Sequence, residues 1–215
     1  MTTGLLDVLL PGDRQAEKKI YGVVVGIVTN NQDSDGMGRV KVRFPWLSDE
    51  GESWWARVAA PMAGNGRGAY FLPEVDDEVL VAFELGDIRF PYVLGALWNG
   101  QDKPPATNDD GKNNIHVIRS RSGHVVRLDD TEGAEKVEII DKTGKNSVVI
   151  DAAANTIAIK ADSDITLESA QGKMVLKAQT IEIQATGQDV KVAATNIEVK
   201  ASAQLTLKGS AVNIN

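Results

Sequence analysis

Apolar side chains recur in closely spaced pairs along the last seventy residues or so of the chain. Each pair consists of an apolar residue, any one residue and a second apolar residue, and successive pairs begin 7 to 9 residues apart. A fixed period of this kind is the signature of a repeat architecture. Because residues i and i+2 of a strand point to the same face, each pair places two apolar side chains on one side of an extended segment, here called a rung. The predicted inward side chains are Val148, Ile150, Ile157, Ile159, Ile165, Leu167, Met174, Leu176, Ile181, Ile183, Val190, Val192, Ile197, Val199, Leu205 and Leu207, and the last rung is Val212-Asn213-Ile214.

A small residue follows each pair, two positions further on, where the third inward side chain of the rung would lie. The residues between and beside the inward positions are mostly polar or charged, such as Glu182 and Lys191. The interior is therefore predicted to be narrow at one end of every rung, as at the corner of a prism. The small residues are Ala152, Ala161, Ser169, Ala178, Ala185, Ala194, Ala201 and Gly209.

The mean period of eight residues indicates how the prism closes. A rung with only two full-sized apolar side chains cannot enclose a core within one narrow coil. Three chains wound about a common axis can do so, and cyclic closure also removes exposed sheet edges. We therefore expect an intertwined trimeric, triple-stranded β-helix rather than a single-chain solenoid.

The composition changes near residue 105. Every aromatic residue lies between Tyr21 and Trp98, and no proline follows Pro105. The front half alternates short β-branched runs with turn residues, with candidate strands at residues 23–28, 40–44, 54–59, 78–84 and 91–97. Five short strands in about 80 residues predict a small Greek-key barrel of the OB type.

Charge and composition exclude several classes of protein. The chain has 215 residues, a formal net charge of −7 and no cysteine. An acidic surface disfavours generic binding to nucleic acid or anionic membranes. The absence of cysteine excludes disulfides and thiolate metal sites. No apolar run reaches membrane-spanning length, and the start of the chain lacks the basic region of a secretory signal, so cytoplasmic synthesis and assembly are expected.

The front half resembles the OB-fold domain of the central spike proteins of contractile tails, which include phage baseplate assembly protein V and the VgrG-type spikes of contractile injection systems. The back half is similar to the trimeric β-helix of the same family in its octad rhythm. The matching segments are GRVKVRFPW at residues 38–46, WWARV at 54–58, PMAGNGRG at 61–68, PEVDDEVLVAF at 73–83, GD at 86–87 and PYVLG at 91–95. Two departures stand out, because Asp76 replaces a usual Gly and Ile88 a frequent Pro.

The resemblance implies an all-β protein with four parts. These are an N-terminal arm at residues 1–19, an OB-fold domain at 20–100, a linker or neck at 101–124 and a trimeric β-helix spike (β-prism) at 125–215. It further implies a non-enzymatic homotrimeric needle without cofactors, seated on a separate hub protein at its OB end. A PAAR-type tip protein is expected to dock at Val212, Asn213, Ile214 and Asn215.

The implied spike pierces a target envelope when a sheath contracts. Its further contacts are the inner tube and sheath, indirectly, and the target membrane, transiently. We expect it to be assembled in the cytoplasm as part of a phage tail or tail-like particle. After firing it would be extracellular or delivered into the target envelope.

Three clusters carry residue types that occur in functional sites, and each has a simpler interpretation. Asp33-Ser34-Asp35-Gly36 begins like a calcium loop, but Phe44 occupies the twelfth position where an EF-hand needs a carboxylate, so a hairpin turn is predicted. The carboxylates at residues 76–78 are interpreted as a solvated turn. His116 and His124 lack a third metal ligand at suitable spacing, so no metal site is predicted.

Two alternative functions remain open from the sequence. Arg39, Lys41 and Arg43 share one strand face near several aromatic residues, as in OB folds that bind single-stranded nucleic acid. A nucleic-acid-binding protein with a trimerising tail is therefore one alternative, although the acidic balance disfavours it. The other alternative is a trimeric fibre or adhesin, which would need a receptor-binding head.

Overall fold

The computed structural model describes residues 19–47, 51–187 and 189–213. The chain divides into two compact units, Met1–Asp162 and Ser163–Asn215. The described residues form an all-β protein, and none of their helices is long and apolar enough to cross a membrane. The elements are β1 (Val23–Asn30), β2 (Lys41–Arg43), β3 (Arg57–Val58), β4 (Ala63–Gly64), β5 (Arg67–Gly68), β6 (Glu78–Phe83), the 3-10 turn η1 (Glu84–Gly86), β7 (Pro91–Ala96), β8 (Ile115–Arg119), β9 (Val125–Asp129), β10 (Lys136–Ile140), β11 (Ser147–Asp151) and β12 (Thr156–Lys160).

The first sheet closes on itself to form a barrel. Its strand order is β2-β1-β6-β7-β3, with β3 parallel to β7 and the other neighbours antiparallel. Val40, just before β2, exchanges two backbone hydrogen bonds of 3.0 and 2.7 Å with Ala56, just before β3. These bonds join the two edges of the sheet, so the barrel leaves little strand edge open to other chains. The predicted five-stranded barrel is thus confirmed in its strands, although the third is shorter than expected.

Alternation along the strands fills the barrel. In β6 every second residue is buried, so that Val79, Val81 and Phe83 point inward while the residues between them face outward. Inward-facing apolar side chains on each strand give a single core, as expected for a small barrel. The core consists of Val28, Val40, Val42, Phe44, Ala56, Val79, Val81, Phe83 and Val93.

Gly26 allows β1 and β2 to approach closely. A Cβ atom on this buried glycine would lie 2.2 Å from Val42 Cγ1 and 3.3 Å from the Arg43 carbonyl oxygen. Such a separation is far below van der Waals contact, so any side chain here would push β2 away. The barrel therefore requires glycine at this position of β1.

Asp76 occupies the left-handed backbone region, with φ of 76°. Its N–H donates to the Val28 carbonyl oxygen at 2.9 Å, and the neighbouring Asp77 side chain accepts from the Glu74 N–H at 2.8 Å. Asp tolerates this conformation better than most residues, and Gly adopts it without strain. The geometry explains why a Gly is usual at this position, and it confirms that residues 76–78 begin with a turn.

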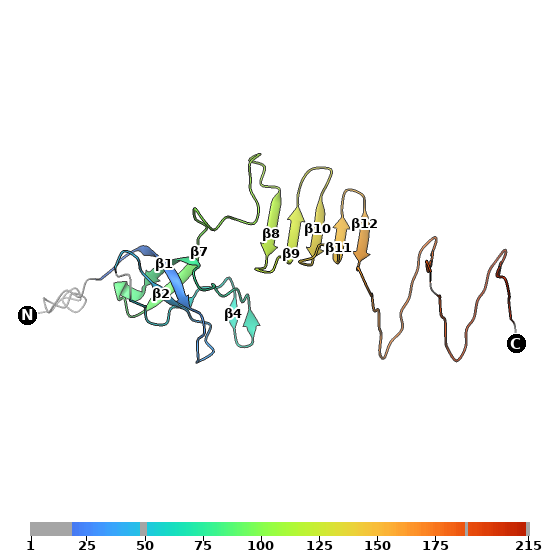
Figure 1. Cartoon of the computed structure of the whole chain (residues 1–215), viewed down its shortest axis with the longest axis horizontal. Helices are drawn as coiled ribbons and strands as arrows, with labels where there is room; N and C mark the ends of the chain where they lie inside the picture. Colours follow the sequence, from blue (N-terminus) through green and yellow to red (C-terminus); the bar gives the residue numbers. More distant parts are fainter. Residues whose placement is uncertain (1–18, 48–50, 188, 214–215) are drawn as a thin grey trace, which may run out of the picture. The chain divides into compact units, whose positions relative to one another are not determined.

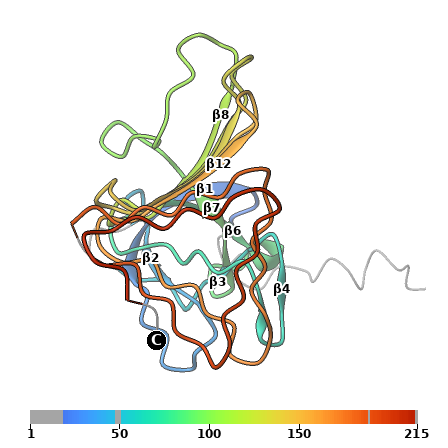
Figure 2. The ribbon, with the colours of Figure 1, turned by 90° about the vertical axis from the view of Figure 1, so that its right-hand side faces the viewer.

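The second sheet is an antiparallel meander of β8 to β12 in sequence order (Figure 1). Seen end-on, its five strands overlie one another with a small twist (Figure 2). Strand β8 lies within residues 101–124, the segment interpreted as a linker and neck. Both outer strands, β8 and β12, are edges of the sheet.

The second unit follows a different course. Its described residues run as a zigzag of extended segments (Figure 1), and end-on these segments follow a roughly triangular path (Figure 2). None of the described residues between 163 and 213 belongs to a strand paired within this chain. The backbone of this unit is therefore open to pairing by other chains.

The close approach at Gly26 gives a testable prediction. Gly26→Ala should destabilise the barrel by about 1–3 kcal/mol, because the added methyl group overpacks the contact with Val42. Thermal unfolding followed by tryptophan fluorescence measures this effect, since all tryptophans precede residue 99.

Gly95→Ala is the matched control. Gly95 lies in β7 with open space around its Cβ position, so the change should alter stability by less than about 0.5 kcal/mol. Equal effects of the two substitutions would contradict the packing argument.

Candidate functional site

One face of the β8–β12 sheet is apolar over all five strands. The strand register places its side chains in two rows that cross the sheet. The first row is Ile118, Val126, Ile139, Val148 and Ile159. The second row is His116, Leu128, Val137, Ile150 and Ile157.

The nine aliphatic side chains of this face are between 36% and 70% exposed. Completing the burial of a half-exposed aliphatic side chain contributes about 1 kcal/mol, so the face offers roughly 9 kcal/mol per chain. That is of the same order as the whole stability of a domain, about 5–15 kcal/mol. An apolar face of this size on a soluble protein marks an interaction site.

The opposite face of the same sheet carries paired charges among aliphatic side chains. Arg127 forms an ion pair with Glu138 across β9 and β10, and Glu138 is only 8% exposed. Lys136 Nζ lies 3.6 Å from Asp151 Oδ2 across β10 and β11. The charged pairs of the sheet therefore lie on this face, whereas the first face is aliphatic apart from His116 and is the one suited to a dry partner.

The extended unit repeats the same pattern rung by rung. Its chain bends at residues 162–163, 170–172, 179, 186–187, 195, 202–203 and 210, and one apolar pair lies between each bend and the next. The residues of these rungs that were predicted to point inward are all more than half exposed in the described chain, from Met174 at 51% to Ile183 at 71%. The small residues, such as Ala178 and Ala194, end the extended segments just before the bends, where corners were predicted.

The sequence-based core list includes only part of the apolar face of the β8–β12 sheet. Ile118, Val126, Leu128, Val137 and Ile139 lie in the same two rows as Val148 and Ile150 but were not included. The signal was present, because Val126-x-Leu128 and Val137-x-Ile139 are doublets of the same kind. Hairpin turns separate them by 11 residues, which hides them from a search for an eight-residue period.

Parts of the predicted sites lie outside the described residues. These are the arm up to residue 18 and, at the predicted tip, Ile214 and Asn215. Val212 is described, at 52% exposed, and Asn213 is exposed as well.

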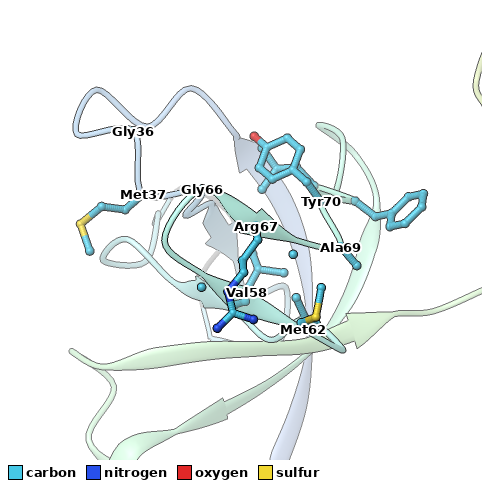
Figure 3. Close-up of a pocket in the computed structure, with 15 residues that line it drawn as sticks. Gly36, Met37, Val58, Met62, Gly66, Arg67, Ala69 and Tyr70 are labelled. Carbon is cyan, nitrogen blue, oxygen red and sulfur yellow. The ribbon is translucent and has the colours of Figure 1, made fainter.

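An open groove of about 560 Å³ lies beside the β4–β5 hairpin of the barrel (Figure 3). Met37, Met62 and Tyr70 line it, and each is more than half exposed. Arg67 is the one charged side chain among its lining residues, which include no carboxylate or imidazole. The groove therefore has the character of a contact surface rather than of an acid–base site.

Two of the three cations on the basic strand face of the barrel, Arg39 and Lys41, are paired with carboxylates. Lys41 Nζ lies 3.0 Å from Glu52 Oε2, and Arg39 pairs with both Asp33 and Asp35. Arg39 and Lys41 also lie 5.7 and 5.5 Å from the ring of Trp55. Because Arg39 and Lys41 are already paired in this way, they offer little attraction to phosphate. This pairing does not favour a nucleic-acid interface.

Asp33 organises the turn between β1 and β2. Its carboxylate accepts hydrogen bonds from the backbone N–H groups of Asp35, Met37 and Arg39, each at 3.2 Å, and from Arg39 Nε at 2.8 Å. The hydrogen bond from the Arg39 side chain holds the pKa of Asp33 far below its ordinary value of 3.8. The predicted hairpin turn is confirmed, and Arg39 and backbone N–H groups occupy the oxygens that a calcium ion would need.

The two histidines make separate local contacts. His116 Nε2 is 3.4 Å from Asp130 Oδ2, and His124 Nδ1 accepts from the Lys142 N–H at 3.2 Å. Within the part of the chain that the structure describes, no three His, Cys, Asp or Glu side chains gather in a way that could hold a metal ion.

Comparison with known proteins identifies the barrel. Residues 24–98 match the family described as the type VI secretion system/phage-baseplate injector OB domain. The matched region covers β1 to β7, and it includes the Val40–Ala56 closure and the groove beside the β4–β5 hairpin.

Several type VI secretion system spike proteins are similar to a longer part of the chain. VgrG3 of Vibrio cholerae is 30% identical over 142 residues, which cover 64% of this chain and 13% of that protein. VgrG1a of Pseudomonas aeruginosa is 31% identical over 148 residues, 61% of this chain and 22% of that protein. VgrG1c of the same organism is 33% identical over 133 residues, 54% of this chain and 18% of that protein.

The resemblance inferred from the sequence is thereby confirmed, as is the all-β fold class. The chain spans between 13% and 22% of the length of these three relatives. The relatives are named as spike proteins of a secretion system, so the likeness is to a component of an injection assembly.

The lowered pKa of Asp33 predicts a specific pH dependence. A group whose folded pKa is depressed stabilises the protein above its unfolded pKa, and this contribution is lost as the pH falls through the folded value. Asp33→Asn should therefore lower the Tm of the barrel at neutral pH, because the ionic pair with Arg39 is lost. The difference between the two proteins should shrink as the pH falls below 3.8.

Thermal melts of both proteins between pH 2 and pH 7 provide the measurement. Asp76→Asn serves as a control, since it changes a turn carboxylate without touching Arg39. A difference that stays constant over the whole pH range would show that the carboxylate charge of Asp33 is not what stabilises the turn.

Proposed function

From the match of residues 24–98 to the injector OB domain and the likeness to VgrG spikes, we propose that this chain is the structural spike of a contractile injection system. Three copies form the spike, with three OB barrels at one end and a β-prism at the other. The spike is driven through a target envelope when the surrounding sheath contracts.

The observation that carries the proposal is the apolar surface that one chain leaves uncovered. The face of the β8–β12 sheet and the rungs beyond residue 163 expose aliphatic side chains at regular intervals, and the rungs have no strand partners in the described chain. Burial of this surface against identical surfaces around a three-fold axis removes it from water, and it provides a neighbour for every strand.

The trimer has two modes of contact along its length. Over residues 115–160 each chain keeps its own sheet, and three apolar faces pack against one another as the sides of a prism. Beyond residue 163 the three chains wind together, so that their strands pair between chains. Backbone ladders and a dry aliphatic core make such a rod stiff, which suits a part that transmits force rather than one that catalyses a reaction.

The same resemblance supports a set of partners. The barrels seat on a hub protein at the end of an inner tube, and the groove at Met37, Met62 and Tyr70 is an apolar surface available for that contact. The last rung, from Val212 to Asn215, receives a PAAR-type tip protein. The spike meets the target membrane only transiently, as part of a particle that is assembled in the cytoplasm and acts outside the cell or in the target envelope.

The proposed trimer predicts the mass of the purified protein. Size-exclusion chromatography with light scattering should give three times the chain mass of 23.1 kDa. A monodisperse monomer would contradict both the trimer and the spike.

An inward charge should prevent assembly. Ile183→Asp places three carboxylates on the three-fold core without partners, and burying an unpaired charge costs several kcal/mol per group. We expect the trimer to be lost while the tryptophan fluorescence of the barrel is retained.

Gln184→Asp is the matched control, because it introduces the same group at the next residue, on the outward side of the rung. This variant should remain trimeric. A heat-stable trimer of Ile183→Asp would show that the doublets do not point inward.

A further inference from the structure

The outward side of the rungs carries charged residues, and their order along the chain indicates which rungs lie side by side. Each rung of the second unit has three outward positions, which lie before, within and after its apolar doublet. In the rung of Val190 and Val192 these are Asp189, Lys191 and Ala193.

Contacts within the chain confirm that these positions share one face. Lys191 Nζ lies 3.6 Å from Asp189 Oδ2, and Lys200 pairs with Glu198. Both pairs are separated by two residues, as expected for side chains on the same side of an extended segment. All four side chains are at least 72% exposed, so they remain open to further partners.

Two kinds of winding place different rungs side by side. The end-on path is roughly triangular (Figure 2). With one rung on each side of the triangle, a chain returns to the same side of the prism after three rungs. In a single-chain coil, a rung would therefore stack on the rung three further along. When three chains share the prism, the place above a rung is filled by the next rung of a neighbouring copy, in parallel orientation and about 4.8 Å away.

Charges at equivalent positions of consecutive rungs are complementary. Five such pairs in the second unit have a charge at both positions, four of them with opposite signs and one, Lys200 with Lys208, with like signs. The complementary pairs are Asp164 with Lys173, Glu168 with Lys177, Glu182 with Lys191 and Lys191 with Glu198.

The single-chain arrangement gives the opposite result. Only two equivalent pairs three rungs apart are charged at both positions, and both have like signs. They are Asp164 with Asp189 and Lys177 with Lys200. Like charges directly opposite in a sheet are destabilising, whereas opposite charges stabilise the pairing.

We propose that these residues form an inter-chain charge ladder, in which the outward charge of each rung faces the opposite charge on the next rung of a second copy of this chain. The ladder rests on the proposed trimeric spike, and it fixes the register between neighbouring chains. It specifies which rung of one copy lies beside which rung of another. A slip that placed equivalent rungs of two copies side by side would bring each charge beside its own kind, for example Glu182 beside Glu182, so the charges also oppose that register.

Charge reversal at Asp164 tests the ladder, because the Asp164–Lys173 pair is isolated. The equivalent position on the rung that follows Lys173 is uncharged, so Lys173 has no second charged partner in the ladder. Asp164→Lys should lower the Tm of the trimer, and Asp164→Lys combined with Lys173→Asp should restore it. In a single-chain coil the lysine introduced by Asp164→Lys would face Asp189 and would raise the Tm instead. The shifts should diminish in 1 M salt, where screening shortens the range of the interaction to about 3 Å.

Cysteine crosslinking locates the neighbours directly, because the chain contains no cysteine of its own. A variant with Glu182→Cys and Lys191→Cys should form disulfides between copies on mild oxidation and run as a covalent trimer under non-reducing conditions. The spacing of adjacent strands suits the Cα separation of a disulfide, about 4.4–6.8 Å. The control pair, Glu182→Cys with Thr206→Cys, joins positions three rungs apart and should give no crosslink.

The outcomes separate the ladder from the proposed function. A protein of three-fold mass that crosslinks through 182 and 191 supports both. A protein of three-fold mass without this crosslink, or with a Tm raised by Asp164→Lys, overturns the ladder and leaves the spike standing. A monomer with an intramolecular 182–206 crosslink overturns both.

Discussion

The N–H and C=O groups of an extended strand need partners along both edges, and the way this chain meets that requirement changes along its length. In the barrel the requirement is met internally, because the Val40–Ala56 bridge joins the last free edges of the sheet. The β8–β12 meander pairs its own strands but leaves two edges and one apolar face open. The described residues between 163 and 213 form no strand that is paired within the chain. Backbone pairing within the chain is therefore complete at the barrel, partial in the meander and absent from the described rungs, so the rungs need other chains as partners.

The repeat was the part of the structure most readily predicted from the sequence, since an eight-residue period and small corner residues depend only on strand alternation and bends. The upstream part of the apolar face was missed for a physical reason. A hairpin turn adds residues between strands, so Val126 and Val137 fall outside the octad spacing. The sheet register nevertheless places Val126 in one row with Val148, and Val137 in one row with Ile150. A rule that searches for doublets at any spacing would have found these residues.

In the barrel, the local sequence pattern predicted some strands but not others. The strands at β1, β6 and β7 have several alternating positions each and were predicted, whereas the two-residue strands β4 and β5 are glycine-rich and carry no periodic signal. The five hydrogen bonds that Asp33 accepts follow from the path of the turn, which no spacing rule specifies. Asp76 lies between these cases. Its departure from a usual Gly was visible in the sequence, but the left-handed backbone that explains it was not.

The free edge of β12 has a kinetic consequence. In the proposed trimer, the meander forms within one chain, whereas the rungs after residue 163 are hydrogen-bonded only once three chains have met. Association of three meanders would then be the nucleus of assembly, with its entropic cost arising once, and each later rung would add next to one already in place. Assembly of the proposed trimer would run from residue 115 toward residue 213, and its slow step would depend on chain concentration. During synthesis the unpaired rungs are the segment most exposed to mispairing, which makes rapid encounter of the three meanders the protection against aggregation.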